Sequence, residues 1–305
     1  REPLTTGGRV TRRTLWLAVA IACATQSCGG GAGSLPAYRG DARGVAVAGL
    51  SSGAFMAVQY EVAFSASVRG AGVVAGGPYY CAAGSALNAA ICMGQVPALP
   101  PAAPLMVAAA RGFATAGQID PLEHLRAHRV HVFRGTRDSV VRAPAVDALV
   151  AFYRALGVAG EALQYVNALP AGHALITADF GNDCEANAAP YISHCTVDGV
   201  GYDQAGAILQ QVFGALNAPA RDPAGELRAF DQAEFGADAA RMAGEGYVYV
   251  PRSCAGGAAC ALLIAFHGCA QSARSVGDRF YAHAGFNRWA DSNDLIVLYP
   301  QVDAS

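Results

Sequence analysis

The chain contains no lysine, so all 21 of its basic residues are arginine. This absence excludes a Schiff-base lysine, a serine-lysine dyad and the phosphate-binding lysine of a P-loop. Charge is scarce as well, with 14% of positions charged and a formal net charge of -2. Long runs of one sign are lacking, and without a basic field to hold a phosphate backbone we predict no nucleic-acid partner.

Apolar residues are abundant instead, at 53% of 305 positions, which is enough for a sizeable core. Short apolar runs alternate with helical stretches, and this alternation predicts an α/β fold with a mostly parallel sheet flanked by helices. The expected strands are 44–49, 70–77, 130–133, 163–166, 246–250, 261–266 and 295–299. The expected helices are 52–64, 143–156, 203–216 and 286–292, with a proline-rich loop at 96–104. A linker is conceivable at 217–223, but the composition is globular on both sides of it and favours one domain.

The N-terminal part has the features of an export signal. Residues 12–24 combine a charged start, a short apolar run and an Ala-x-Ala ending. The run is too short to span a bilayer, so we predict no transmembrane segment. Cys28, followed by glycines, resembles a lipid-modified cysteine, and a buried N-terminal helix is the remaining alternative. We predict a signal or lipoprotein-like segment at 1–28 and a Gly-rich tether at 29–42, in a secreted, extracellular protein; a periplasmic or lipid-anchored one is the alternative.

The chain has nine cysteines, of which Cys23 and Cys28 fall in or beside the export segment. Six of the others form close pairs in loop-like sequence, as local disulfides of an exported protein do. The pairs are Cys81 with Cys92, Cys184 with Cys195, and Cys254 with Cys260. Cys269 is left over. A zinc site would need a second pair or a histidine set at finger spacing, so we predict no metal.

Residues 49–53 read Gly-Leu-Ser-Ser-Gly and fit the G-x-S-x-G nucleophile elbow. In this motif the flanking glycines permit a tight turn that lifts a serine above the edge of a sheet. The expected strand before Ser51 and the expected helix after it are the elements that an elbow requires. Ser51 is therefore the candidate nucleophile, with an ordinary Gly/Ser turn as the alternative.

A serine nucleophile needs a base, and the base needs an acid to hold its tautomer. Asp138 lies in a loop after a predicted strand, and His173 lies in a loop after the next one. The order Ser, Asp, His is that of α/β-hydrolases. Asp138 as a turn cap, and Asp179 or Asp183 as the acid, are the alternatives.

The remaining histidines fit other roles. We expect His124 and His128 on a helix surface, His131 within a strand, His194 in a cysteine-bounded loop and His283 near a helix. His267 belongs to Phe-His-Gly-Cys at 266–269, which follows a buried strand as an oxyanion loop does. In α/β-hydrolases this loop precedes the elbow, whereas here it follows. A circular permutation, with the opening strands moved to the end of the chain, accounts for the order.

Several further segments match one family. They are Gly-Gly-Pro-Tyr-Tyr-Cys at 76–81, Phe-Asp-Gln-Ala-Glu-Phe at 230–235, Gly-Tyr-Val-Tyr-Val-Pro at 246–251, the loop from Cys254 to Cys260, Trp-Ala-Asp at 289–291 and Leu-Tyr-Pro at 298–300. With the elbow and the Phe-His-Gly-Cys segment, they resemble the single-domain, circularly permuted poly(3-hydroxybutyrate) depolymerases over residues 43–301. The resemblance implies a circularly permuted α/β-hydrolase domain at 43–305.

The resemblance also implies roles for residues. Ser51 is the implied nucleophile, His173 the base and Asp138 the acid, with the backbone amides of Ser52 and Cys269 as oxyanion donors. No cofactor is implied. Relatives continue beyond the position of Ser305 into a segment with Cys and Trp that completes the substrate cleft. We therefore expect the domain to be C-terminally incomplete, with the partner of Cys269 in the absent part.

The expected function is extracellular ester hydrolysis of poly(3-hydroxybutyrate) through an acyl-enzyme. A feruloyl or acetyl esterase acting on plant polysaccharide is one alternative, because such esterases share the elbow and differ in the cleft. A non-catalytic, polymer-binding protein on a hydrolase scaffold is the other. The expected partner is a polyester or another ester substrate, and the oligomeric state is left open.

Overall fold

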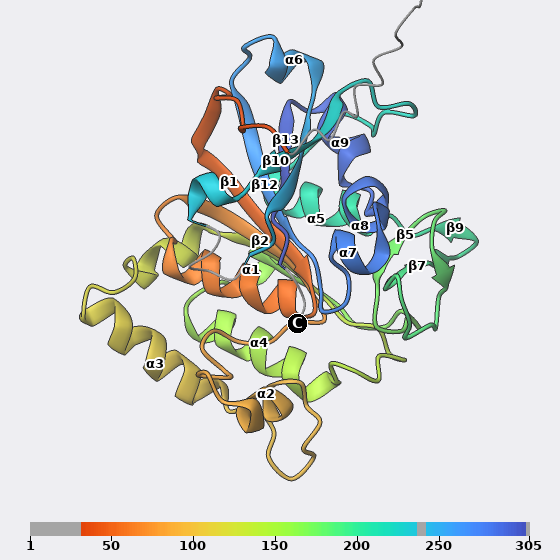
Figure 1. Ribbon diagram of the computed structural model, residues 1–305. Coiled ribbons are helices and arrows are strands. Elements are labelled where there is room, and N and C mark those ends of the chain that lie inside the picture. The colour runs from red at the N-terminus through yellow and green to blue at the C-terminus, as the bar shows by residue number, and fades with distance from the viewer. Residues whose placement is uncertain (1–31, 237–241, 303–305) are drawn as a thin grey trace, which may run out of the picture. The chain divides into compact units, whose positions relative to one another are not determined.

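Eight strands form one sheet through the centre of the fold, in the order β10-β11-β13-β12-β1-β2-β3-β4 (Figure 1). The structure is a computed structural model and describes residues 32–236 and 242–302. The predicted export segment at 1–28 lies outside the described residues. The strands are β1 (Gly40–Leu50), β2 (Val68–Val74), β3 (Arg129–Phe133), β4 (Leu163–Val166), β10 (Glu226–Asp231), β11 (Glu245–Val250), β12 (Cys260–Phe266) and β13 (Leu295–Tyr299).

The sheet confirms the predicted circular permutation. Strand β12, late in the chain, pairs in parallel with β1, the first strand, and β13 continues beyond it. Strands β2, β3 and β4 follow on the other side of β1, also in parallel. Only β11 runs antiparallel to both of its neighbours, β10 and β13. The fold is therefore a mostly parallel α/β-hydrolase sheet in which strands late in the described chain lie beside the first described strand.

Helices cover both faces of the sheet (Figure 1). Helices α1, α3 and α4 lie on one face, and α5 and α9 pack together on the other. The helices are α1 (Ser52–Ala63), α2 (Ala86–Cys92), α3 (Ala103–Thr115), α4 (Ala143–Ala155), α5 (Gln204–Phe213), α6 (Arg252–Ala255), α7 (Ala273–Val276), α8 (Arg279–His283) and α9 (Phe286–Ser292), with 3-10 helices η1 (Leu122–Ala127), η2 (Gly160–Ala162) and η3 (Ala233–Phe235). The central strands are covered on both sides, and their middle parts are apolar; Val47, Leu263 and Val297 are fully buried.

Two short sheets lie beside the main one. Strands β5 (Leu175–Thr177), β7 (Ile192–His194) and β6 (Asn182–Asp183) form the first, and β8 (Thr196–Val197) and β9 (Val200–Gly201) form the second. Helices α2 and α3 were not expected from the sequence. The predicted proline-rich loop ends where α3 begins, with a proline in its first turn, a position that tolerates the missing N–H.

The described fold begins earlier than residue 43, the predicted start of the domain. Strand β1 begins at Gly40, within the stretch predicted as a tether. Upstream of it, the carbonyl of Gly33 accepts a hydrogen bond from the amide of Asp231 (2.9 Å), and that of Arg39 accepts one from Cys260 (3.0 Å). Residues 33–42 are thus tied to β10 and β12.

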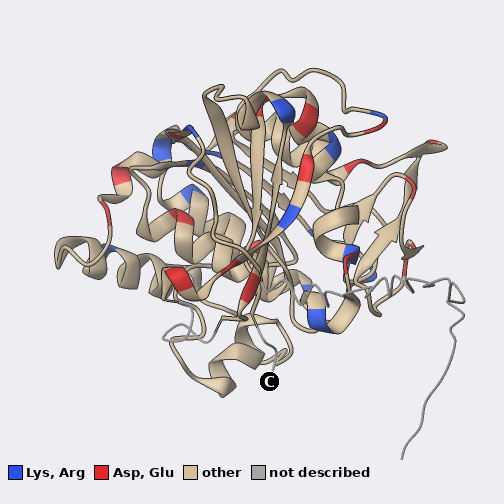
Figure 2. Ribbon diagram, turned by 45° about the horizontal axis from the view of Figure 1, so that its top comes forward, with Lys and Arg blue, Asp and Glu red and all other residues tan. Residues whose placement is uncertain are grey.

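Charged residues of both signs are interspersed over the described ribbon (Figure 2). Strands β12 and β13 contain none. In the described part of the chain, no helix has the length and apolar character needed to cross a membrane.

A buried polar cluster connects helices α1 and α4 with the residue that follows η1. Glu61 of α1 accepts hydrogen bonds from the hydroxyl of Tyr153 in α4 and from Nδ1 of His128 (3.0 Å). The other ring nitrogen of His128 donates to the carbonyl of Ser65 (3.0 Å). All three side chains are almost fully buried. The prediction that His128 lies on a helix surface is therefore wrong, because it follows η1 and turns inward to meet a carboxylate from α1.

The cluster makes stability depend on pH. Burial alone would lower the pKa of His128, but the hydrogen bond and charge of Glu61, with the Ser65 carbonyl, leave that pKa above its ordinary value of 6.5. A raised pKa in the folded state means that protonation of His128 stabilises the fold fully below pH 6.5. This stabilisation is lost as the pH rises through the raised value.

We expect Glu61→Gln to destabilise the protein by about 3 kcal/mol, because it breaks a buried charged pair. The variant should also lose the extra stability that the wild type has at acid pH. Denaturant unfolding at about pH 5.5 and about pH 8.5 measures both effects. Glu123→Gln is the control: Glu123 is exposed in η1, and its loss should change stability by less than about 0.5 kcal/mol. If the free energy of unfolding of Glu61→Gln depended on pH as it does in the wild type, Glu61 would not be the cause of the raised pKa of His128.

Candidate active site

The predicted site residues follow four strands that run in the same direction. Ser51 comes directly after β1, Asp138 lies in the loop after β3, and His173 in the loop after β4. The Phe-His-Gly-Cys segment ends β12 and continues beyond it. Since these strands are mutually parallel through β2, their carboxyl ends meet at one edge of the sheet. This is the edge at which open α/β sheets bind ligands.

Ser51 occupies the strained turn that an elbow requires. Its backbone has φ 57° and ψ -124°, a region that residues with a side chain rarely adopt. Its amide donates to the carbonyl of Val74 at the end of β2 (2.9 Å), and its carbonyl accepts from Phe55 in the first turn of α1 (2.9 Å). These two bonds hold the turn between strand and helix, so the strain is maintained by its surroundings.

The two glycines of the motif are required by close backbone approach. A Cβ on Gly49 would lie 2.4 Å from the carbonyl oxygen of Gly53. A Cβ on Gly53 would lie 2.2 Å from the carbonyl oxygen of Phe266 and 2.5 Å from that of His267. Real Cβ atoms do not come this close, so any larger residue would push α1 away from the end of β12.

His173 and Asp138 are brought together as predicted. Nδ1 of His173 lies 2.8 Å from Oδ2 of Asp138, and both side chains are nearly buried. The other carboxylate oxygen of Asp138 accepts the amides of Val140 (2.8 Å) and Val141 (2.9 Å). A carboxylate that accepts these bonds favours the proton on Nδ1 of His173, which leaves Nε2 free to accept another.

The two alternative acids face other partners. Asp179 pairs with Arg288 (3.5 Å), and Asp183 lies 4.0 Å from Nε2 of His194. Both aspartates are exposed. Among the described carboxylates, the hydrogen bond to His173 is made by Asp138.

The His267-Gly268 pair shapes the loop after β12. Nδ1 of His267 donates to the carbonyl of Gly268 (2.8 Å), and Nε2 accepts the amide of Val302 (3.1 Å). Burial lowers the pKa of His267, in agreement with a neutral ring that both donates and accepts. His267 therefore fixes the loop against the segment after β13.

Gln271 connects this loop to the surroundings of His173. Its side-chain oxygen accepts the amide of Gly268 (2.8 Å), and its nitrogen donates to the carbonyls of Pro190 (2.9 Å) and Tyr191 (3.1 Å). The ring of Tyr191 meets that of His173 edge to face, with centroids 6.0 Å apart. Gln271 is fully buried. Sequence reasoning missed it, since its only signal is its place two residues after Cys269.

Three of the predicted site residues line one cavity. Ser51, Ser52 and Cys269 border a space of about 570 Å³ whose other walls are mainly apolar. Ser52 is the first residue of α1, where a backbone N–H has no acceptor within the helix. The remaining lining residues are Phe55, Met56, Gln59, Tyr80, Cys81, Ala82, Ala83, Gly84, Ala89, Cys92 and Met93.

The described residues form three disulfides with the pairing expected from spacing: Cys81–Cys92, Cys184–Cys195 and Cys254–Cys260. The first forms part of the wall of the Ser51 cavity. The second bounds the loop that follows His173. Cys269 is free and exposed.

Among the described histidines, those assigned other roles do not line the Ser51 cavity. His124 and His194 are exposed. His131 is buried in β3, and burial lowers its pKa to about 4. His283 stacks on Phe180 at a centroid distance of 4.2 Å.

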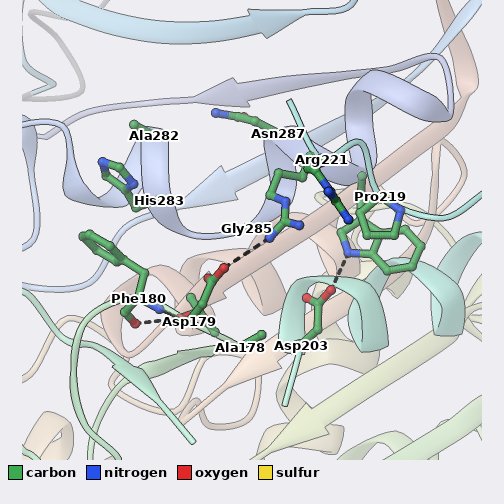
Figure 3. Close-up of a pocket in the computed structure, with 13 residues that line it drawn as sticks. Ala178, Asp179, Phe180, Asp203, Pro219, Arg221, Ala282, His283, Gly285 and Asn287 are labelled. Carbon is green, nitrogen blue, oxygen red and sulfur yellow. Dashed lines mark hydrogen bonds and ion pairs between the residues drawn. The ribbon is translucent and has the colours of Figure 1, made fainter. Parts of the chain in front are cut away.

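A second cavity, of about 490 Å³, lies between the β5 region and helices α8 and α9 (Figure 3). It shares no lining residue with the Ser51 cavity. Two pairs of polar groups meet in its lining: Arg288 with Asp179, and the indole nitrogen of Trp289 with Asp203 (2.7 Å). None of the predicted catalytic or oxyanion residues lies here.

The fold, the turn at Ser51 and the buried pair of His173 with Asp138 are those of the α/β-hydrolase class. No protein-family model matches the chain. It is 42% identical over 298 residues to a poly(3-hydroxybutyrate) depolymerase of Delftia acidovorans, an alignment that covers 94% of this chain and 58% of the relative. It is 36% identical over 276 residues to a polyhydroxybutyrate depolymerase of Talaromyces funiculosus, which covers 88% of this chain and 77% of that one. The chain belongs to the poly(3-hydroxybutyrate) depolymerase family.

Solved structures agree with this assignment. The crystal structure of a PHB depolymerase from Penicillium funiculosum superposes with a TM-score of 0.80 at 35% identity, covering 88% of this chain and 82% of that chain. A PHB depolymerase variant complexed with an R3HB trimer matches equally well. The chain spans 58% of the length of the Delftia relative.

We expect Gly53→Ala to lower kcat/KM for a soluble p-nitrophenyl ester by about 100-fold, because its Cβ displaces the end of β12 from the turn at Ser51. It should also destabilise the fold by about 1–3 kcal/mol. Gly112→Ala in α3 is the matched control, since a Cβ there meets nothing within 4 Å. That helical change should add about 0.5–1 kcal/mol of stability and leave turnover intact. Equal effects of Gly53→Ala and Gly112→Ala on kcat/KM would contradict the role given to the contact between Gly53 and the end of β12.

Proposed function

We propose that this protein hydrolyses ester bonds of poly(3-hydroxybutyrate) with Ser51 as nucleophile, His173 as general base and Asp138 as the orienting acid. The geometric observation that carries the chemistry is the 2.8 Å contact between Asp138 and Nδ1 of His173 at the edge where Ser51 emerges. Membership of the depolymerase family supports poly(3-hydroxybutyrate) as the substrate.

In the first half of the reaction, the hydroxyl oxygen of Ser51 attacks the ester carbonyl while Nε2 of His173 takes its proton. The negative charge that develops on the carbonyl oxygen is stabilised by the amides of Ser52 and Cys269. Collapse of this intermediate breaks the ester bond. The leaving alcohol, the hydroxyl end of one chain fragment, receives the proton from His173, and the other fragment remains as an acyl ester on Ser51.

In the second half, water attacks the acyl ester and gives a proton to His173. Collapse returns that proton to Ser51 and releases a carboxylic acid. The carboxylate of Asp138 stabilises the positive imidazole that forms in both halves.

The cavity at Ser51 suits an apolar, methyl-bearing chain. Its lining is mainly apolar, and it carries no charged side chain. Met56 and Tyr80, at 48% and 43% exposure, also line it and reach solvent. A solid polymer could thus meet apolar surface at the entrance, whereas a charged ester would find no counter-ion there.

Secretion is part of the proposal. Three disulfides within the described residues are typical of oxidising compartments. An insoluble polyester that lies outside a cell cannot enter it, so an enzyme that degrades it has to be exported.

The test is hydrolysis of amorphous poly(3-hydroxybutyrate) and of an R3HB trimer by the purified protein, beside Ser51→Ala. We expect the wild type to release soluble acid from both and the variant to lose at least about 10³-fold in rate. Ser52→Ala is the matched control, because it keeps the backbone amide that the mechanism uses.

A feruloyl ester and an acetylated polysaccharide are assayed in parallel. Turnover of one of these without the polyester would replace the substrate assignment. Polymer binding without any turnover, unchanged in Ser51→Ala, would show a non-catalytic binding protein.

A further inference from the structure

We infer that Asn187 is a positioning residue for the acid and base of the proposed mechanism, and the inference rests on that function. Its side-chain oxygen accepts the amides of His173 (2.9 Å) and Ser139 (3.0 Å). Its side-chain nitrogen donates to the carbonyls of Arg137 (3.1 Å) and Glu185 (3.1 Å). One carboxamide thus binds the backbone of both catalytic loops.

The pattern uses the full hydrogen-bonding capacity of the side chain. An asparagine has two acceptor sites and two donors, and all four are occupied here by backbone groups. Three of the partners belong to His173 itself or to the two residues that flank Asp138. No other natural side chain of this length both donates and accepts in this way. Aspartate would lose both donors, and leucine would make none of the bonds.

The backbone hydrogen bonds between the two loops lie on one side of Asp138. The amide of Thr136 donates to Leu169 (2.8 Å), and that of Arg137 donates to Ala171 (3.0 Å). Both bonds precede Asp138 in the chain. Asn187 binds on both sides of it, at the carbonyl of Arg137 and the amide of Ser139. It therefore fixes the direction in which the Asp138 side chain leaves the backbone. It also fixes the position of the Asp138 loop relative to His173.

The segment that carries Asn187 is itself held in place. The Cys184–Cys195 disulfide closes it, and the amide of Gly172 donates to the carbonyl of Cys184 (2.8 Å). A Cβ on Gly172 would lie 2.2 Å from the carbonyl oxygen of Ala186, so the two backbones are in direct contact. The rigid segment therefore presents Asn187 to the catalytic loops from a fixed position.

Asn187 does not line the Ser51 cavity, so it acts through His173 and Asp138 and not on the substrate. Loss of the Asn187 side chain should weaken the hydrogen bond between His173 and Asp138 and misplace Nε2 of His173 relative to Ser51. A misplacement on the scale of 1 Å costs roughly 100-fold in rate. Binding of the ester should be unaffected, because the cavity wall is unchanged. The expected signature is a fall in kcat at constant KM.

The experiment compares Asn187→Ala and Asn187→Asp with the wild type on p-nitrophenyl butyrate, recording kcat, KM and the thermal midpoint. We expect kcat to fall about 100-fold in Asn187→Ala with KM unchanged. Asn187→Asp keeps the acceptors for His173 and Ser139 but loses the donors, so its kcat should fall about 10-fold. If Asn187→Ala does not fold, the kcat of Asn187→Asp tests the inference in its place.

Asn182→Ala is the matched control. Asn182 lies two residues before Cys184, and its side-chain nitrogen also donates to two backbone carbonyls, those of Ala188 and Ala189 in the segment that carries Asn187. Neither bond ends on a catalytic loop. Asn182→Ala should lower the thermal midpoint with kcat unchanged. A similar loss of kcat in the control, or wild-type kcat in Asn187→Ala, would overturn the inference. A wild type without esterase activity would instead refute the proposed function.

Discussion

The parallel pairing of β12 with β1 is the contact on which the site depends. It aligns Gly49 with Phe266, and beyond this pair the chain of β1 turns at Ser51 while that of β12 continues into His267 and Gly268. The backbone of Gly53 then lies against the carbonyls of Phe266 and His267. Without that approach the amide of Ser52 and the loop of Cys269 would not border one cavity. The proposed oxyanion donors are therefore products of strand register, and glycine is the only residue that permits them.

A second group of contacts connects this pair of strands to His173. Gln271 joins the Gly268 loop to Tyr191, whose ring meets that of His173. Asn187 joins His173 to both neighbours of Asp138. The bonds by which these two amides join the loops all end on backbone groups. Because these bonds end on backbone groups, they do not depend on the side chains of the residues that they join.

Much of this was predictable because it is local. Continuous apolar runs at 44–49 and 261–266 predicted buried strands, and the Gly-x-Ser-x-Gly spacing predicted the turn at Ser51. The order of Asp138 and His173 after successive strands predicted their meeting. What escaped prediction depends on partners distant in sequence. His128 is buried because Glu61 meets it from another helix, and an isolated histidine beside a short helix carries no sign of that. Helix α2 has only seven residues, and α3 begins within the proline-rich stretch at 96–104, where prolines favour a loop. Asn187 and Gln271 are ordinary polar residues until their loops are folded.

The order of the strands has a consequence for the newly made protein. Synthesis delivers the serine turn, its helix and the aspartate and histidine loops first, and such segments begin to fold as they emerge. Strand β12, which supplies the carbonyl wall behind Gly53 and the loop of Cys269, is added near the end of the described chain. Its partner β1 must wait, unpaired on that side, for a contact of long sequence separation, which is slow to form. An unfinished chain therefore holds Ser51 without the loop of Cys269, so one of the two proposed oxyanion donors is the last part of the proposed site to be placed.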